Sequence, residues 1–170
     1  YRFTQDERYL QRAKDVANYL LVTEDNMPED LVPLWDFDIV EFANNLPQDE
    51  FLYPKLKDKD LPKQYTEIRD VSSAAIIASA LYELYWITKD DFYKEKADKM
   101  IESLSAAPYR AELGTNGGFI LKHSVGSLPH SLLNIEAGRP HDHNIDVPLN
   151  YADYYFLEAL IRKGRVEKGE

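Results

Sequence analysis

A short pattern, T-x-D-x-x-Y-x-x-x-A, occurs twice in this chain, 84 positions apart. Each copy opens a segment in which apolar residues recur at the spacing of one helix face. The equivalent positions are Thr4, Asp6, Tyr9, Ala13 and Leu20 in the first copy and Thr88, Asp90, Tyr93, Ala97 and Leu104 in the second. An internal repeat of this kind predicts a fold of similar helical units that bury their apolar faces against one another.

The first copy predicts an amphipathic helix over about residues 4–21, and the second copy predicts a matching helix over about residues 88–104. Thr4 is the expected N-cap of the first helix. Asp6 and Glu7 then lie in its first turn, where the helix dipole stabilises negative charge.

A different kind of helix is predicted before the second copy, over residues 71–87 with the sequence VSSAAIIASALYELYWI. Its residues are apolar on nearly every face, as in a helix that is buried on all sides. The hairpin therefore pairs an inner helix with an amphipathic outer helix, and residues 150–164 predict another inner helix. The expected fold class is all-α.

Residues 1–3 correspond by the repeat to residues 85–87, which end an inner helix. We therefore expect the chain to be the C-terminal portion of a longer helical-hairpin protein. A short lead-in that matches by coincidence is the alternative. Residues 1–170 are expected to form a single, partial domain, with long loops at about 24–69 and 114–148 on the rim where a cleft opens.

Composition excludes several classes of protein. The formal net charge of −10 disfavours binding to nucleic acid and to anionic membranes. The chain has no cysteine, so it forms no disulfide and no thiolate metal site. The longest apolar stretch contains Glu83, so no membrane span is expected. The cellular compartment stays open, with bacterial cytoplasm and periplasm both allowed.

The segment PLWDFD places Trp35 between apolar residues and two carboxylates, Asp36 and Asp38. Aromatic faces stack on sugar rings, and carboxylates accept hydrogen bonds from sugar hydroxyls. The segment therefore indicates a carbohydrate subsite, or else an aromatic anchor for a long loop.

Two further segments carry candidate site residues. In RDVSSAA, Asp70 or one of the following serines can cap the inner helix, and the free N–H groups there could bind a carboxylate. In LKHSVGS, His123 and Ser124 follow an apolar, strand-like run. His123 could be an acid, a base or a hydrogen-bond donor, although lone histidines are more often structural.

The loop RPHDHNID groups His141, Asp142 and His143. A metal site needs ligands that converge from more than one segment. A solvated loop is the preferred interpretation, so no metal is predicted. Signature motifs for phosphate binding and for a serine nucleophile elbow are absent from the sequence.

Four stretches, LWDFD, DVSSAAIIASALYEL, GGFILKHSVGS and IDVPLNYADYYFLEAL, occur in this order over nearly the whole chain. Together they resemble the C-terminal half of glycoside hydrolase family 88, the unsaturated glucuronyl hydrolases. The resemblance implies an (α/α)6 barrel and no cofactor. It also implies release of an unsaturated uronic acid from lyase-generated oligosaccharides, as an aspartate protonates the C4–C5 double bond and activates water.

The resemblance places the family's two catalytic aspartates in an N-terminal half that this chain does not contain. It therefore implies no catalytic residue here, only residues that shape the substrate site. These are Trp35, Asp36, Asp70, His123, Ser124 and Tyr151. The expected partners are an unsaturated uronic-acid oligosaccharide and either the missing half or a second copy that covers the exposed inner helices.

Two alternatives stay open from the sequence. The chain could be an inert helical-hairpin module that binds carbohydrate or acts as a scaffold. An aspartate of this chain, namely Asp36, Asp38, Asp70 or Asp146, could instead have been recruited as the acid.

Overall fold

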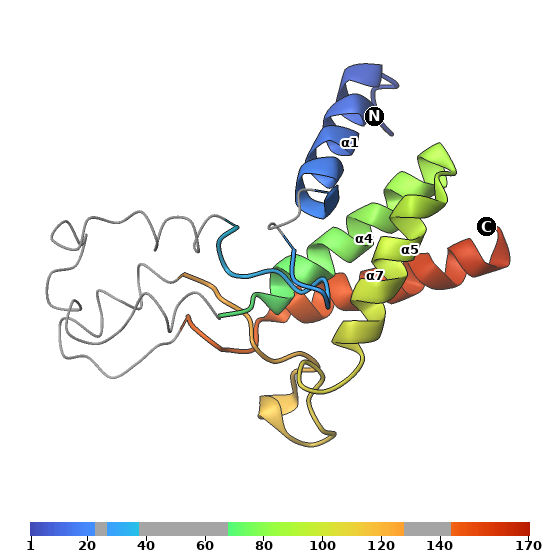
Figure 1. Cartoon of the computed structure of the whole chain (residues 1–170). Helices are drawn as coiled ribbons and strands as arrows, with labels where there is room; N and C mark the ends of the chain where they lie inside the picture. Colours follow the sequence, from blue (N-terminus) through green and yellow to red (C-terminus); the bar gives the residue numbers. More distant parts are fainter. Residues whose placement is uncertain (23–26, 38–67, 128–143) are drawn as a thin grey trace, which may run out of the picture.

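The computed structural model describes residues 1–22, 27–37, 68–127 and 144–170. These residues form four α-helices and one short 3-10 helix (Figure 1). In chain order the elements are α1 (Glu7–Val22), α4 (Val71–Thr88), α5 (Asp91–Leu104), η2 (Asn116–Gly118) and α7 (Asn150–Lys168). The described part contains isolated β-bridges but no strand, so the all-α prediction is confirmed and the strand-like run ending at His123 forms only single bridges.

Helix α4 is the centre of the fold and packs against both α7 and α5 (Figure 1). Small residues line its contact surfaces, and Ala74, Ala75 and Ala78 are fully buried. Ala152 and Ala159 on α7 are equally buried, so the two helix backbones approach closely. The predicted inner helices are thus neighbours, and α5 is the outer helix of the hairpin.

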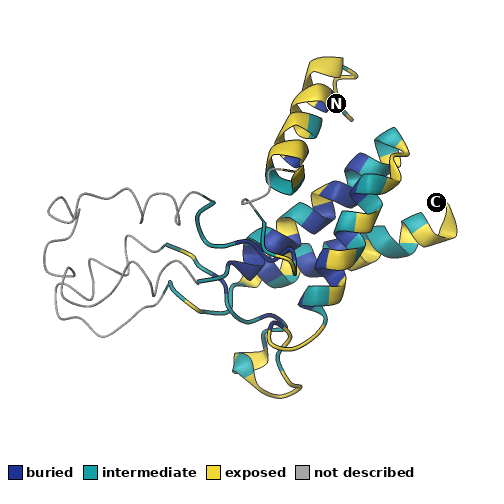
Figure 2. Ribbon diagram, in the orientation of Figure 1, coloured by how far each residue is buried: buried dark blue, intermediate teal, exposed yellow. Residues whose placement is uncertain are grey.

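By length and composition alone, α4 could cross a membrane, since its mean hydropathy over 18 residues is 1.2. Half of the helix is buried inside the fold, however, as in a core helix (Figure 2). Glu83, which lies in this apolar helix, pairs with Arg162 at 2.7 Å and with Arg2 at 3.4 Å. Burial of α4 within the protein therefore explains its hydropathy.

The two copies of the repeat form the same helix corner. In the second copy, Thr88 Oγ1 accepts a hydrogen bond from the Asp90 N–H, and Asp90 Oδ1 accepts one from the Phe92 N–H. In the first copy, Thr4 and Asp6 accept the equivalent hydrogen bonds. The N-cap of α1 is therefore Asp6, and the prediction of Thr4 was wrong by two residues because the threonine holds the capping aspartate.

The equivalent apolar faces of the two copies differ in burial. Tyr93 and Ala97 on α5 are buried against α4, whereas the equivalent Tyr9 on α1 is 58% exposed. Helix α1 stands apart from the other helices and touches α4 at few points (Figure 1). Among the described residues, no inner helix covers α1 as α4 covers α5.

Asp98 joins three helices through polar contacts. Its carboxylate accepts hydrogen bonds from Tyr82 of α4 at 2.7 Å, from Lys94 of α5 at 2.6 Å and from Lys163 of α7 at 2.5 Å. Burial by itself would raise the pKa of Asp98, but these hydrogen bonds outweigh it and lower the pKa to about 2. The Asp98 carboxylate therefore links α7 to the hairpin of α4 and α5.

Candidate functional site

The segments that carry the predicted site residues meet at the N-terminal ends of α4 and α7, which lie at the same end of the fold (Figure 1). Backbone hydrogen bonds join these segments. The Trp35 N–H donates to the Ile68 carbonyl, and the Asp70 N–H donates to the Pro33 carbonyl. The Val71 N–H donates to the carbonyl of His123 at 3.1 Å. Loop residues far apart in the chain thus form one polar surface around two helix ends.

Asp70 is the N-cap of α4, which confirms the capping interpretation. Its side chain accepts hydrogen bonds from the N–H of Ser72 at 3.1 Å and from the hydroxyls of Ser72 and Ser73 at 2.7 and 2.6 Å. The Val125 N–H donates to the same carboxylate at 3.2 Å. Asp70 is only 7% exposed. It therefore joins α4 to the histidine segment, and its oxygens are already occupied.

His123 lies between Asp146 and Tyr109. Its Nδ1 is hydrogen-bonded to the Asp146 carboxylate, and the Tyr109 ring lies edge-on at 6.3 Å between ring centroids. About a third of the His123 side chain, 35%, is accessible. The Asp146 carboxylate thus approaches Nδ1, and Nε2 is the other ring nitrogen.

Ser124, next to His123, is fully buried. Its backbone exchanges two hydrogen bonds of 3.0 Å with Val147, which pairs the histidine segment with the segment that leads into α7. The Ser124 hydroxyl has no hydrogen-bond partner among the described groups. Ser124 therefore contributes to the packing of the site, and its hydroxyl does not face solvent.

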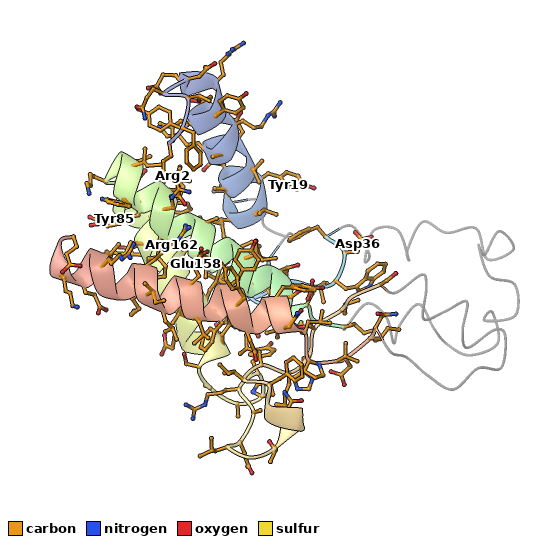
Figure 3. The ribbon with its side chains drawn as sticks, turned by 180° about the vertical axis from the view of Figure 1, so that it is seen from behind. Arg2, Tyr19, Asp36, Tyr85, Glu158 and Arg162 are labelled. Atoms are coloured by element: carbon orange, nitrogen blue, oxygen red, sulfur yellow. The ribbon has the colours of Figure 1, made fainter. Side chains whose placement is uncertain are left out.

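The loop that carries Trp35 and Asp36 is anchored by Asp30. The Asp30 carboxylate accepts hydrogen bonds from the Tyr109 hydroxyl at 2.6 Å and from Arg69 at 3.3 Å. Trp35 and Asp36 are half-buried, and Asp36 lies beyond the N-terminal end of α4, far from Arg2 and Tyr85 (Figure 3). Nothing in the segment MPEDLVP distinguishes Asp30 from a solvated loop aspartate, so its role could not be predicted from the sequence.

Asp153 is a second residue whose role was not predicted from the sequence. It lies in the first turn of α7, and its two carboxylate oxygens accept the N–H groups of Ile120 and Leu121 at 2.8 and 2.9 Å. The side chain thus holds the run that leads to His123 against α7. Tyr151 lies in the same turn and is 39% exposed, so its side chain is accessible at the helix end.

The geometry is suited to binding a polar ligand. It offers an accessible imidazole, an accessible phenol and a half-buried tryptophan on the segments near the N-terminal ends of two helices. A cavity of about 460 Å³ lies elsewhere, between α4 and α7 at Trp86 and Tyr154. The Glu83–Arg162 ion pair lines that cavity. We place the site at the N-terminal ends of α4 and α7 instead, because the segments that carry the predicted site residues meet there.

Two of the sequence hypotheses fall outside the described residues. Asp38 is one of them, and the cluster of His141, Asp142 and His143 is the other. Within the parts of the chain that the structure covers, no three histidine or acidic side chains converge as metal ligands.

Comparison with known proteins links the chain to one enzyme family, although no family model matches it. The chain is 36% identical over 163 residues to an unsaturated glucuronyl hydrolase of Formosa agariphila. It is 29% identical over 167 residues to an unsaturated chondroitin disaccharide hydrolase of Streptococcus pneumoniae. These matches cover 96% and 95% of this chain but only 32% and 33% of the two relatives.

Solved structures give the same result. A crystal structure of an unsaturated glucuronyl hydrolase specific for heparin is 36% identical and aligns with a TM-score of 0.73 over 99% of this chain and 36% of its own. The enzyme from Bacillus sp. GL1 is 22% identical, with a TM-score of 0.62, and supports the fold alone. These neighbours are α/α barrels, and this chain has the fold of part of such a barrel.

The chain thus spans about one third of the length of the curated relatives that it matches. That extent is consistent with the C-terminal portion expected from the motifs. By sequence and by fold, the chain is related to the unsaturated glucuronyl hydrolases of glycoside hydrolase family 88, as its motifs predict.

Proposed function

We propose that this chain supplies the substrate-binding part of a glycoside hydrolase of the unsaturated glucuronyl type. The complete enzyme would release an unsaturated uronic acid from lyase-generated oligosaccharides by acid-catalysed hydration of the C4–C5 double bond. The catalytic acid would lie outside these 170 residues. Trp35, Asp36, His123 and Tyr151 would line the bound sugar.

One observation carries this proposal: the four segments that resemble the family meet at the N-terminal ends of α4 and α7. The relatives support the class of substrate. One related structure is solved with the oligosaccharide dGlcA-Glc-Rha-Glc, and other relatives are named for glucuronyl, chondroitin or heparin substrates. A sugar of this kind presents hydroxyl groups and a carboxylate, which suit an imidazole, a phenol and an aromatic face.

Two of the four candidate acids, Asp70 and Asp146, are engaged in other contacts. Asp70 is buried and engaged in four hydrogen bonds, and Asp146 is paired with His123. A general acid needs a carboxyl group placed at the reacting bond and free to deliver its proton. Neither residue meets both requirements in this arrangement, so the contacts argue against Asp70 and Asp146 as the acid.

We further propose that a polypeptide corresponding to the rest of the relatives' length covers α1, α4 and α7. An apolar groove of about 540 Å³ lies between α1 and α4, and it is lined by residues such as Val16, Leu20 and Ile77. On α7, Tyr154, Leu157 and Ile161 are 59%, 47% and 58% exposed. Such surfaces are uncommon on monomers and favour association.

Binding of an unsaturated uronic-acid disaccharide tests the site. We expect saturable binding by calorimetry, and we expect Tyr151→Ala to weaken it about tenfold, as for loss of one aromatic contact. Tyr19→Ala, on the distant α1, is the matched control and should bind like the wild type. Binding that is equal for a saturated disaccharide would instead support an inert carbohydrate-binding module, and absence of binding would support a scaffold.

A further inference from the structure

The pair of His123 and Asp146 is held in a backbone conformation that non-glycine residues rarely adopt. The φ angles are +64° at His123 and +55° at Asp146, both in the left-handed region. Residues persist in this region where the surrounding structure determines the backbone on both sides. Here the following residues, Ser124 and Val147, are joined by two reciprocal hydrogen bonds of 3.0 Å. The chain therefore fixes the two side chains next to each other.

Among the residues that the structure describes, Asp146 supplies the carboxylate that contacts the His123 ring. Asp146 contacts Nδ1 directly. Asp70 is close in the fold, because the Val71 N–H donates to the His123 carbonyl, but its carboxylate is occupied by serine and backbone donors. Tyr109 contacts the ring through its edge, and its hydroxyl donates to Asp30. No hydrogen bond to Nε2 is present among the described residues.

We propose that Asp146 is a positioning residue that holds His123 in the Nδ1–H form, so that Nε2 accepts a hydrogen bond from a hydroxyl group of a bound carbohydrate. A histidine that donates from Nδ1 to a carboxylate has its lone pair on Nε2. The accessible third of the His123 side chain, 35%, provides the contact surface. The identity of the carbohydrate, an unsaturated uronide, rests on the proposed function.

The ring state can be measured without any ligand. Long-range proton–nitrogen correlation spectra of the full chain distinguish protonated from unprotonated ring nitrogens, and His123→Gln identifies the signals of this residue. At a pH above the histidine titration, we expect Nδ1 of His123 to carry the hydrogen. In Asp146→Gly we expect the hydrogen to move to Nε2, which is the usual form of a free imidazole.

Two variants of Asp146 distinguish the effect of losing the carboxylate from the effect of disturbing the backbone. Glycine adopts a φ of +55° without strain, so Asp146→Gly removes the carboxylate and preserves the backbone. Asparagine also tolerates this conformation, and its side-chain oxygen still accepts a hydrogen bond. Asp146→Asn should therefore keep the Nδ1–H form. A wild-type His123 with its hydrogen on Nε2, or a ring state unchanged in Asp146→Gly, would overturn the assignment.

A ligand titration then separates this inference from the proposed function. With an unsaturated uronic-acid disaccharide, the Nε2 signal should shift in the wild type and in Asp146→Asn. Affinity should fall about tenfold in Asp146→Gly, as for loss of one hydrogen bond. If the wild type binds but Asp146→Gly binds equally well, the role of Asp146 is refuted. If no unsaturated uronide binds the wild type, the proposed function fails, and the ring state alone decides the role of Asp146.

Discussion

Gln5 and Lys89, 84 positions apart, occupy equivalent helix corners with one shared backbone geometry. Their φ angles are +55° and +59°, and each donates its N–H at 2.7 Å to the carbonyl of a tyrosine four residues earlier, Tyr1 or Tyr85. The repeat seen in the sequence is therefore a repeat of hydrogen bonds and not only of residue types. The repeated geometry includes the middle position of T-x-D, where the two copies have different residues, Gln5 and Lys89.

Lys89→Gly should stabilise the fold. Lys89 is exposed and takes the left-handed conformation, which glycine adopts without the steric cost that other residues incur. We expect a gain of about 1 kcal/mol in the free energy of unfolding. Urea denaturation measures it, with Lys99→Gly as the control in the middle of α5, where glycine should cost about 1 kcal/mol. If Lys89→Gly lowered the free energy of unfolding as much as Lys99→Gly does, the left-handed conformation assigned to Lys89 would be contradicted.

Asp98 should make the fold sensitive to acid. Its pKa is lowered from 3.8 to about 2 in the folded state, so the folded state binds its proton less readily than the unfolded state does. The Asp98 carboxylate therefore adds about 2 kcal/mol to the free energy of unfolding above a pH of about 4, and this contribution is lost as the pH falls towards 2. Denaturation measured against pH should show this loss.

The variant Asp98→Asn should remove that acid-dependent loss and lower stability at neutral pH, because Lys94 and Lys163 lose their anion. Glu95→Gln, an exposed substitution on the same helix, should leave the pH profile unchanged. If the stability of Asp98→Asn depended on pH in the same way as that of the wild type, the Asp98 carboxylate would not stabilise the folded state.

Asp153→Ala should loosen the histidine segment. The substitution leaves the N–H groups of Ile120 and Leu121 without their carboxylate acceptors, at a cost of about 2 kcal/mol. Amide hydrogen exchange should accelerate at these two residues more than in α5. Exchange that stays slow at both would mean that Asp153 does not hold the segment.

Tyr109→Phe should weaken the anchor of the Trp35 loop. Burial, and then the Asp30 carboxylate, raise the pKa of Tyr109 to about 12. The pKa of Tyr109 in the folded state exceeds its value of 10.0 in the unfolded state. The stabilising contribution of the Tyr109 hydroxyl is therefore present below pH 10 and is lost as the pH rises through about 12. We expect a loss of about 1–3 kcal/mol at neutral pH by urea denaturation. Tyr9→Phe, at an exposed tyrosine, is the control and should change stability by less than about 0.5 kcal/mol.

The sequence predicted the helices because their signals are local. Apolar periodicity located α4, α5 and α7, and Asp70 was recognisable as a cap from the residues beside it. The cap of α1 was misassigned because Thr4 and Asp6 are both good capping residues, and only the backbone geometry decides between them.

The long-range contacts of the site could not be predicted in this way. Asp153 and Asp30 are ordinary acidic residues in the sequence, and their partners lie about 30 to 80 positions away. The pairing of His123 with Asp146 depends on two left-handed residues, which no apolar pattern encodes. The sequence offered His123 as a candidate because it follows an apolar run, and the family resemblance added its role in substrate binding.

The most direct test is an assay of the hydrolysis of an unsaturated uronic-acid disaccharide. The reaction is monitored as the loss of the ultraviolet absorbance of the conjugated double bond in the substrate. The chain would be assayed alone and with a polypeptide spanning the unmatched length of the Formosa agariphila relative, with native mass spectrometry to verify that a complex forms. We predict no hydrolysis by the chain alone and hydrolysis by the complex. Turnover by the chain alone, or an inactive complex of verified composition, would contradict the account.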